Sequence, residues 1–363
     1  MNIVILGLSI TSSWGNGHAT TYRGLVRELT RQGHQVLFLE RDMPWYAAQR
    51  DLPNPPFGDT RLYESLPALK RDFADAIRAA DAVIIGSYVP DGVAVAEWVL
   101  DEANGCVAFY DIDTPVTLVK LAGGDYEYIE PGLIPRYDLY LSFTGGPVLA
   151  RLEDEFGARR ARPLYCSVDP DIHYPDRPSP RWDLGYLGTY SADRQPRVNS
   201  LLLEPARRAP NRNFVVAGAQ FPEDVTWPAN VEHLEHVAPA AHRGFYNAQR
   251  FTLNVTRDAM IAAGYAPSVR LFEAAACGVP VISDSWNGLD TFFEPGREIL
   301  IADERDAVLD YLYNLPEHER QAVGERARER VMAAHTAAHR ARELVEYLQA
   351  SLPRRQARRA AAQ

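Results

Sequence analysis

Short apolar segments alternate with amphipathic helical patterns along the first half of the chain. Strands are predicted at residues 3–8 and 34–39, with a helix at 20–32 between them. The same alternation then continues through residues 72–80, 82–85, 91–102, 106–110 and 139–143. Strands that alternate with helices form a parallel sheet covered on both faces. The first half therefore predicts a doubly wound α/β domain.

The alternation breaks at residues 169–180, where four of twelve residues are proline: Pro170, Pro175, Pro178 and Pro180. Proline is excluded from helix interiors and central strands, so this segment is predicted to be a hinge. Beyond it the alternation restarts, at residues 184–187, 195–207, 214–217, 240–247, 251–255, 269–276 and 279–283.

Four parts are expected: an N-terminal Rossmann-like domain at 1–168, the hinge at 169–180, a C-terminal Rossmann-like domain at 181–335, and a C-terminal helix with a basic tail at 336–363. Two such domains joined by a hinge place a cleft between the carboxyl ends of their sheets, where doubly wound folds bind ligands. The predicted fold class is thus α/β, with two Rossmann-like domains facing a cleft and long C-terminal helices.

The end of the chain is helical and charged from residue 317 to 352, and four arginines follow it: Arg354, Arg355, Arg358 and Arg359. A basic end of this kind is typical of a solvated terminus. The alternative is peripheral binding to an anionic membrane or to nucleic acid.

The whole chain of 363 residues is acidic, with a formal net charge of −10, which argues against a broad nucleic-acid-binding surface. Of its 38 cationic residues only Lys70 and Lys120 are lysines, so any anion site must use guanidinium groups or backbone N–H groups. Three widely spaced cysteines, no basic segment before the first apolar run, and no apolar run of membrane length predict a cytoplasmic protein without a transmembrane segment.

The segment 264–283 carries the most specific chemistry and predicts a loop, a short helix and a strand. Ser268 is expected to cap the start of the helix and Gly278 its end. The free N–H groups at the helix start, together with the Arg270 guanidinium, make an anion site. Glu273 lies one turn further along the same side. The alternative interpretation is a surface ion pair between Arg270 and Glu273.

Other candidate residues follow predicted strands. Arg257, after strand 251–255, is expected to stabilise a leaving diphosphate, unless it forms an ion pair with Asp258. Arg194 and Arg197 are weaker candidates for the same role. In the first domain, Gly17 and His18 open the first helix, where His18 is expected either to orient a substrate or to cap the helix.

Asp111 and Asp113 follow the strand 106–110 and are expected on the acceptor side of the site. Asp113 is a candidate general base or orienting group, and the alternative is an aspartate that caps a loop. The histidines lack the spacing of a zinc site, and neither a hydrolase nucleophile elbow nor a P-loop motif occurs.

Residues 264–283 resemble the nucleotide-sugar-binding signature of GT-B glycosyltransferases, in particular family 4 and the group related to the spore maturation protein CgeB. Residues 166–175 resemble the family's entry into its second domain, and loop 12–20 resembles the CgeB-related group. The resemblance implies that Glu273 binds the donor ribose, that the donor base packs near His236, and that the diphosphate lies at Gly188, Thr189, Ser268, Val269 and Arg270.

Two departures from the family pattern stand out. Family 4 enzymes usually carry a second glutamate eight residues before the ribose ligand, where this chain has Tyr265. They also often carry a histidine at the strand end occupied here by Asp111 and Asp113. The metal-binding Asp-x-Asp motif belongs to the other, GT-A architecture, so the resemblance implies no metal and no cofactor.

The implied function is transfer of a sugar from a nucleoside diphosphate sugar to an acceptor, with retention of the anomeric configuration. Candidate functional groups for this reaction are His18, Asp113 and Arg257. The alternatives are an epimerase or hydrolase of the same fold, and a binding or structural protein of the same shape without catalysis. The donor base, the sugar, the acceptor and the oligomeric state stay open.

Overall fold

The computed structural model describes residues 1–176 and 179–362, with side chains described up to residue 352, so Pro178 of the predicted hinge and the arginines of the predicted basic tail lie outside the described side chains. The chain divides into two compact units. Unit 1 comprises residues 1–166 with the segment from Ala337 onward, and unit 2 comprises Ser167–Thr336.

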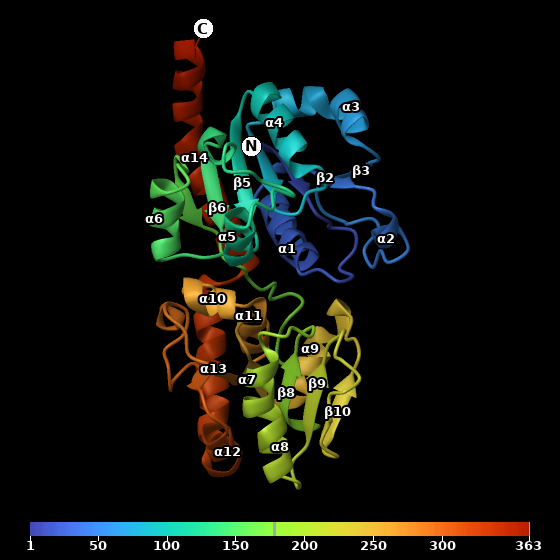
Figure 1. Cartoon of the computed structure of the whole chain (residues 1–363), viewed down its shortest axis with the longest axis vertical. Helices are drawn as coiled ribbons and strands as arrows, with labels where there is room; N and C mark the ends of the chain where they lie inside the picture. The colour runs from blue at the N-terminus through green and yellow to red at the C-terminus, as the bar shows by residue number, and fades with distance from the viewer. Residues whose placement is uncertain (177–178, 363) are drawn as a thin grey trace. The chain divides into compact units, whose positions relative to one another are not determined.

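Unit 1 is built on a seven-stranded parallel sheet in the order β3-β2-β1-β4-β5-β6-β7 (Figure 1). Its strands are β1 Asn2–Gly7, β2 Gln35–Arg41, β3 Asp59–Tyr63, β4 Ala82–Gly86, β5 Cys106–Asp111, β6 Leu139–Ser142 and β7 Ala161–Pro163. Its helices are α1 His18–Arg31, α2 Pro44–Ala47, α3 Leu66–Ala79, α4 Gly92–Glu102, α5 Thr114–Ala122, η1 Ile134–Arg136, α6 Pro147–Asp154 and α14 Ala337–Ala362.

Helix α14 belongs to unit 1, although it comes last in the sequence. Its buried residues Ala341, Leu344 and Leu348 join the same core as the strands of the unit, and it packs along α1. The prediction of one continuous helix over residues 317–352 is wrong in one respect. The helix is interrupted at His335 and Thr336, between α13 (Glu317–Ala334) and α14, where the two units meet in the sequence.

Unit 2 repeats the same plan with six parallel strands in the order β10-β9-β8-β11-β12-β13. The strands are β8 Trp182–Leu187, β9 Phe214–Ala217, β10 Val231–Leu234, β11 Gln249–Asn254, β12 Val281–Ser283 and β13 Leu300–Ile301. The helices, besides α13, are α7 Gln195–Val198, η2 Asn199–Leu203, α8 Glu204–Arg208, α9 Pro239–Asn247, α10 Asp258–Ala263, α11 Val269–Ala276, η3 Leu289–Thr291 and α12 Arg305–Asn314.

Both sheets change direction of winding at one point, between β1 and β4 in unit 1 and between β8 and β11 in unit 2. At such a switch point the loops after the two central strands diverge, which leaves a crevice at the carboxyl ends where doubly wound folds bind ligands. The predicted fold class, two parallel α/β sheets with C-terminal helices, is confirmed.

The helix predicted at 195–207 is present but irregular. Its middle, Asn199–Leu203, is a π-helix, and Pro205 follows in the next turn. Proline has no N–H for the ordinary i→i−4 bond, which makes a local change of winding favourable at this place.

Cys106, Cys166 and Cys277 are buried and are not joined in disulfides. Among the described residues, no helix has both the length and the apolar character that crossing a membrane requires.

Candidate functional site

Helix α11 begins and ends where the sequence predicts. It starts at Val269, and Ser268 is its N-cap residue as predicted, although the Ser268 side chain makes no capping hydrogen bond. At the other end Gly278 has φ of +72°, its N–H donates to Ala275, and the N–H of Val279 donates to Ala274. This pair of bonds is the Schellman ending that favours glycine.

The loop before α11 is conformationally strained. Tyr265 has φ of +48°, which is rare for an aromatic residue, and its N–H donates to the carbonyl of Asn287 at 2.6 Å. Strain of this kind concentrates at ligand-binding loops and is held by the surrounding structure.

Arg270 lies across the switch point of the unit 2 sheet. Its Nε donates to the carbonyl of Leu187, at the end of β8, at 2.6 Å, and its Nη1 donates to Oδ1 of Asn254, at the end of β11, at 2.8 Å. The guanidinium also lies 4.9 Å from the ring centre of Tyr186. It is only 6% exposed, so a full positive charge is held in the crevice by neutral groups.

Two further arginines approach the same crevice. Arg194 is buried and donates to the carbonyl of Thr189 at 2.5 Å, while its Nε has no hydrogen-bond partner among the described residues. Burial, and next the charges of Arg270 and Arg257, lower the pKa of Arg194, and its neighbours Tyr186 and Asp193 oppose that effect. The Arg194 guanidinium thus lies close enough to Arg270 and Arg257 to be repelled by their charges.

Arg257 is exposed, and its guanidinium makes no hydrogen bond or ion pair with a described residue. The alternative partner, Asp258, instead pairs with Arg197 at 2.5 Å. An ion pair between Arg257 and Asp258 is therefore wrong. Arg197 is occupied at the rim, whereas Arg257 is available to an incoming anion.

Glu273 is the only acidic side chain of α11 and is 4% exposed. Its Oε2 accepts a hydrogen bond from the Tyr246 hydroxyl at 3.0 Å. Nε2 of His173 lies 3.8 Å from Oε1, and Nδ1 of His242 lies 3.7 Å from Oε2. A surface ion pair between Arg270 and Glu273 is therefore wrong, because both groups are buried with other partners.

The surroundings of Glu273 keep it ionised. Burial alone would raise the pKa of this carboxyl, but the nearby imidazoles of His173 and His242, and the hydrogen bond from the Tyr246 hydroxyl, lower the pKa to about 2. An ionised carboxylate accepts about four hydrogen bonds. Within the described part of the chain only the Tyr246 hydroxyl donates to it at hydrogen-bond distance, so much of its accepting capacity is left for a ligand.

His173, His242 and Glu273 are also metal-ligand types, and their donor atoms lie within 4.8 Å of one another. Two ligands of a tetrahedral zinc ion lie about 3.4 Å apart when each bond is about 2.1 Å. The contacts of 3.7 and 3.8 Å are longer, so the arrangement corresponds to a carboxylate between two imidazoles. His173 and His242 were not predicted from the sequence, and only the first lies in a segment with a recognisable pattern.

The other predicted donor residues occupy loops at the carboxyl edge of the same sheet. Gly188 and Thr189 follow β8, and His236 is exposed in the loop after β10. The neighbouring His233 stacks on Trp227 with ring centres 4.5 Å apart. The structure therefore brings the predicted diphosphate residues together, and it places His236 at the surface without a described side-chain partner.

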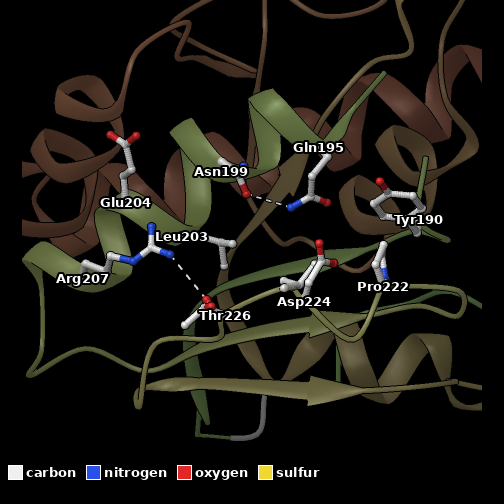
Figure 2. A pocket seen from close by; sticks show the side chains of 10 residues that line it. Tyr190, Gln195, Asn199, Leu203, Glu204, Arg207, Pro222, Asp224 and Thr226 are labelled. Atoms are coloured by element: carbon white, nitrogen blue, oxygen red, sulfur yellow. Dashed lines mark hydrogen bonds between the residues drawn. The ribbon is translucent and has the colours of Figure 1, made fainter. Parts of the chain in front are cut away.

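A separate open hollow of about 470 Å³ lies between the helical stretch α7–η2–α8 and the loop after β9 (Figure 2). Tyr190 and Pro222 border it at one end, and Arg207, which donates to the Thr226 carbonyl, borders it at the other. Tyr190 and Gln195, next to the predicted residues Thr189 and Arg194, line this hollow, but neither Arg270 nor Glu273 does.

In unit 1, His18 is the first residue of α1 and follows Gly17. It does not cap the helix through its side chain, and its ring lies edge-on to Tyr88, with ring centres 5.5 Å apart. The side chain is buried and Nδ1 has no partner among the described residues. Burial lowers the pKa of His18 to about 4, so the imidazole is neutral at neutral pH.

Asp111 and Asp113 differ in their surroundings. Asp111 is fully buried at the end of β5, where it accepts hydrogen bonds from Tyr140 at 2.6 Å and Thr117 at 2.7 Å. Burial raises the pKa of Asp111 to about 6, with these hydrogen bonds opposing the rise. Asp113 is half-buried at the start of α5 and makes no side-chain capping bond there.

Replacing His18 with glutamine is expected to reduce the acid sensitivity of folding. The unfolded chain takes up a proton near pH 6.5, whereas the folded chain resists it until about pH 4. Stability is therefore lost as pH falls through this window, by up to about 3 kcal/mol. Denaturant unfolding at pH 7 and pH 4.5 should show a smaller loss for the variant; an equal loss would contradict the buried neutral imidazole.

Replacing Gly218 with alanine is expected to destabilise the protein by about 1–3 kcal/mol. A Cβ there would lie 2.0 Å from the carbonyl oxygen of Gly188, so the loop beside Arg270 must move. Thermal unfolding checks this against Gly244→Ala, where the new Cβ meets nothing within 4 Å and helix propensity predicts a gain of about 0.5–1 kcal/mol. Unchanged stability of Gly218→Ala would contradict the packing.

Residues 194–346 match the family model described as glycosyl transferase-like. Sucrose-phosphate synthase from Thermosynechococcus elongatus is similar in structure, with 15% identity, a TM-score of 0.69, and coverage of 96% of this chain and 98% of that chain.

Anabaena HepE, solved with UDP and glucose, is similar at 12% identity with a TM-score of 0.70, over 96% of this chain and 100% of that chain. An alpha-glucosyltransferase solved with UDP has the same identity, TM-score and coverage. No curated protein matches the sequence significantly.

Proposed function

We propose that this chain is a GT-B glycosyltransferase that takes a sugar from a nucleoside diphosphate sugar bound in unit 2. The observation that carries the proposal is the pairing of two features at one switch point. Glu273 is a buried, ionised carboxylate with unused accepting capacity, and Arg270 holds a positive charge in the same crevice. A nucleoside diphosphate has ribose hydroxyls that can donate to the carboxylate and phosphates that can bind the guanidinium.

The ribose of the donor suits Glu273. Two vicinal hydroxyls would donate to the carboxylate, and hydrogen bonds to an ionised group are the strong ones. The Tyr246 hydroxyl already orients the carboxylate from the protein side. The identification of Glu273 as the ribose ligand follows the resemblance to family 4 and the CgeB-related group, and kinship with those groups is part of the proposal.

The diphosphate suits the arginines. Arg270 and Arg194 line the crevice, and Arg257 presents an unpaired guanidinium from its rim. The start of α11, at Ser268, Val269 and Arg270, adds free N–H groups and the positive end of the helix dipole. These groups would neutralise the leaving diphosphate, so the proposed mechanism is independent of a metal. The retention of configuration is proposed from the resemblance alone.

Unit 1 is proposed to hold the acceptor. Asp113 and the neutral imidazole of His18 follow strands on either side of β4, at the carboxyl edge of its sheet. A neutral imidazole can accept the proton of an attacking hydroxyl at neutral pH. Asp111 is proposed to shape the acceptor site indirectly, because its carboxylate is buried against Tyr140 and Thr117.

A ligand panel tests the donor. UDP, dTDP, GDP and ADP are compared by thermal shift, and a ligand at a hundred times its dissociation constant raises stability by about 2.7 kcal/mol. One of the four nucleotides is expected to raise the unfolding temperature clearly more than the others. Sugar derivatives of that nucleotide are then incubated with the protein, and release of the nucleoside diphosphate is followed. Strong release without any acceptor would favour a hydrolase, and binding without release would favour a protein that lacks catalysis.

A further inference from the structure

His242 lies between two oxygen atoms, and each of them faces one of its ring nitrogens. Its Nε2 is 3.1 Å from the carbonyl oxygen of Val237, and its Nδ1 is 3.7 Å from Oε2 of Glu273. The residue comes from α9, which packs beside α11 in unit 2 (Figure 1). One fifth of its side chain is exposed, whereas His173 and Glu273 beside it are almost fully buried.

The partners of His242 determine which of its ring nitrogens carries a hydrogen. A carbonyl oxygen only accepts, so Nε2 must carry a hydrogen. In the neutral ring Nδ1 would then present a lone pair to the ionised carboxylate of Glu273. In the protonated ring Nδ1 presents an N–H instead. Burial alone would lower the pKa of His242, but the Glu273 carboxylate and the Val237 carbonyl raise it above its ordinary value.

Other titratable and charged groups also face this pair. They are Arg243 and Tyr246 on α9, His173 on the segment before β8, Arg270 on α11, and Cys277 at the end of α11. Burial lowers the pKa of His173, raises that of Tyr246 and raises that of Cys277 to about 12. His242 is the imidazole of this cluster whose loss of a proton is moved toward alkaline pH, whereas that of His173 is moved toward acid pH.

We propose that protonated His242 holds the Glu273 carboxylate in position for the donor ribose, so that nucleotide binding weakens when His242 loses its proton. The inference rests on the proposed function and assigns His242 as a positioning residue. Glu273 stays ionised throughout, because its pKa is about 2. When Nε2 keeps its bond to Val237, loss of the His242 proton sets the Nδ1 lone pair against the Glu273 carboxylate. The other tautomer keeps the Nδ1 N–H toward Glu273 but breaks the bond to Val237, so each neutral form loses one of the two contacts that hold the protonated ring in place.

The test measures UDP affinity from pH 6 to pH 9 for four proteins. In the wild type, affinity is expected to fall about tenfold over this range, the loss of about one hydrogen bond to a charged group. His242→Asn retains an N–H at the Nδ1 position but does not titrate, so it should bind nearly as tightly as the wild type at pH 6 and show little pH dependence. His242→Leu should bind weakly at every pH.

Two controls separate this effect from others. His318→Asn changes a histidine that is 80% exposed on α13 and should follow the wild type. 2′,3′-dideoxy-UDP lacks the hydroxyls that Glu273 would bind, so its affinity should show only the pH dependence of the phosphates. Thermal unfolding of each variant shows whether it is folded.

Three results would overturn the inference. The first is a His242→Asn variant with the full pH dependence of the wild type, and the second is tight UDP binding by a folded His242→Leu variant. The third is stoichiometric uptake of Zn²⁺ or Co²⁺ that His173→Ala abolishes, which would make the cluster a metal centre. Absence of UDP binding by the wild type, together with failure of the other nucleotides, would instead remove the proposed function itself.

Discussion

Glu273→Gln is expected to lower the affinity for the donor nucleoside diphosphate by about 10- to 100-fold. Glutamine has the same shape, but it turns one strong acceptor into a donor and removes the charge that strengthens the ribose hydrogen bonds, which are worth about 1.5–3 kcal/mol each. Isothermal titration with UDP, or with whichever nucleotide the panel selects, measures the change.

The control for this variant is Glu325→Gln, which alters an exposed glutamate on α13 and should leave the affinity unchanged. The 2′,3′-dideoxy nucleotide should bind the wild type and Glu273→Gln about equally. If Glu273→Gln is folded and binds the complete nucleotide as tightly as the wild type, Glu273 is not the ribose ligand.

Arg257→Ala is expected to weaken nucleoside diphosphate binding by about tenfold or more, while the affinity for the nucleoside without phosphates stays the same. Arg257 is exposed and its guanidinium makes no described hydrogen bond or ion pair, although its charge acts on Asp193, so its removal should affect folding little. Arg270→Lys should have a larger effect, because lysine keeps the charge but cannot bridge Leu187 and Asn254 while facing an anion.

Arg297→Ala is the matched control for the arginine variants. Arg297 is 64% exposed and pairs with Glu294 at 2.9 Å, and Arg297 is not part of the crevice. The dependence of binding on salt should be weaker in Arg257→Ala than in the wild type and Arg297→Ala. A uniform loss of affinity for nucleoside and nucleotide alike would contradict the assignment of Arg257 to the diphosphate.

The alternation of apolar and polar segments was enough to predict both parallel sheets. Central strands such as β4 and β5 are apolar throughout, as strands buried on both faces are. Strand β3 was missed because it lies at an edge and is mostly polar, and β13 because it has two residues. The membership of α14 in unit 1 depends on packing against α1, which a local pattern does not contain.

The candidate site was predictable in its residue types but not in its partners. The local pattern fixes the limits of α11 and puts Arg270 and Glu273 on one side of it. Whether they pair with each other depends on groups far away in the sequence: Leu187 for Arg270, and His173 for Glu273. The local pattern was therefore equally compatible with a surface ion pair.

The most direct test of the central claim is a crystal structure of the protein with the nucleoside diphosphate that stabilises it most. The ribose hydroxyls are predicted to lie about 2.5–2.7 Å from the carboxylate oxygens of Glu273, with the phosphates against Arg270 and Arg257. A nucleotide bound instead in the hollow between Tyr190 and Thr226, with Glu273 untouched, would contradict the account.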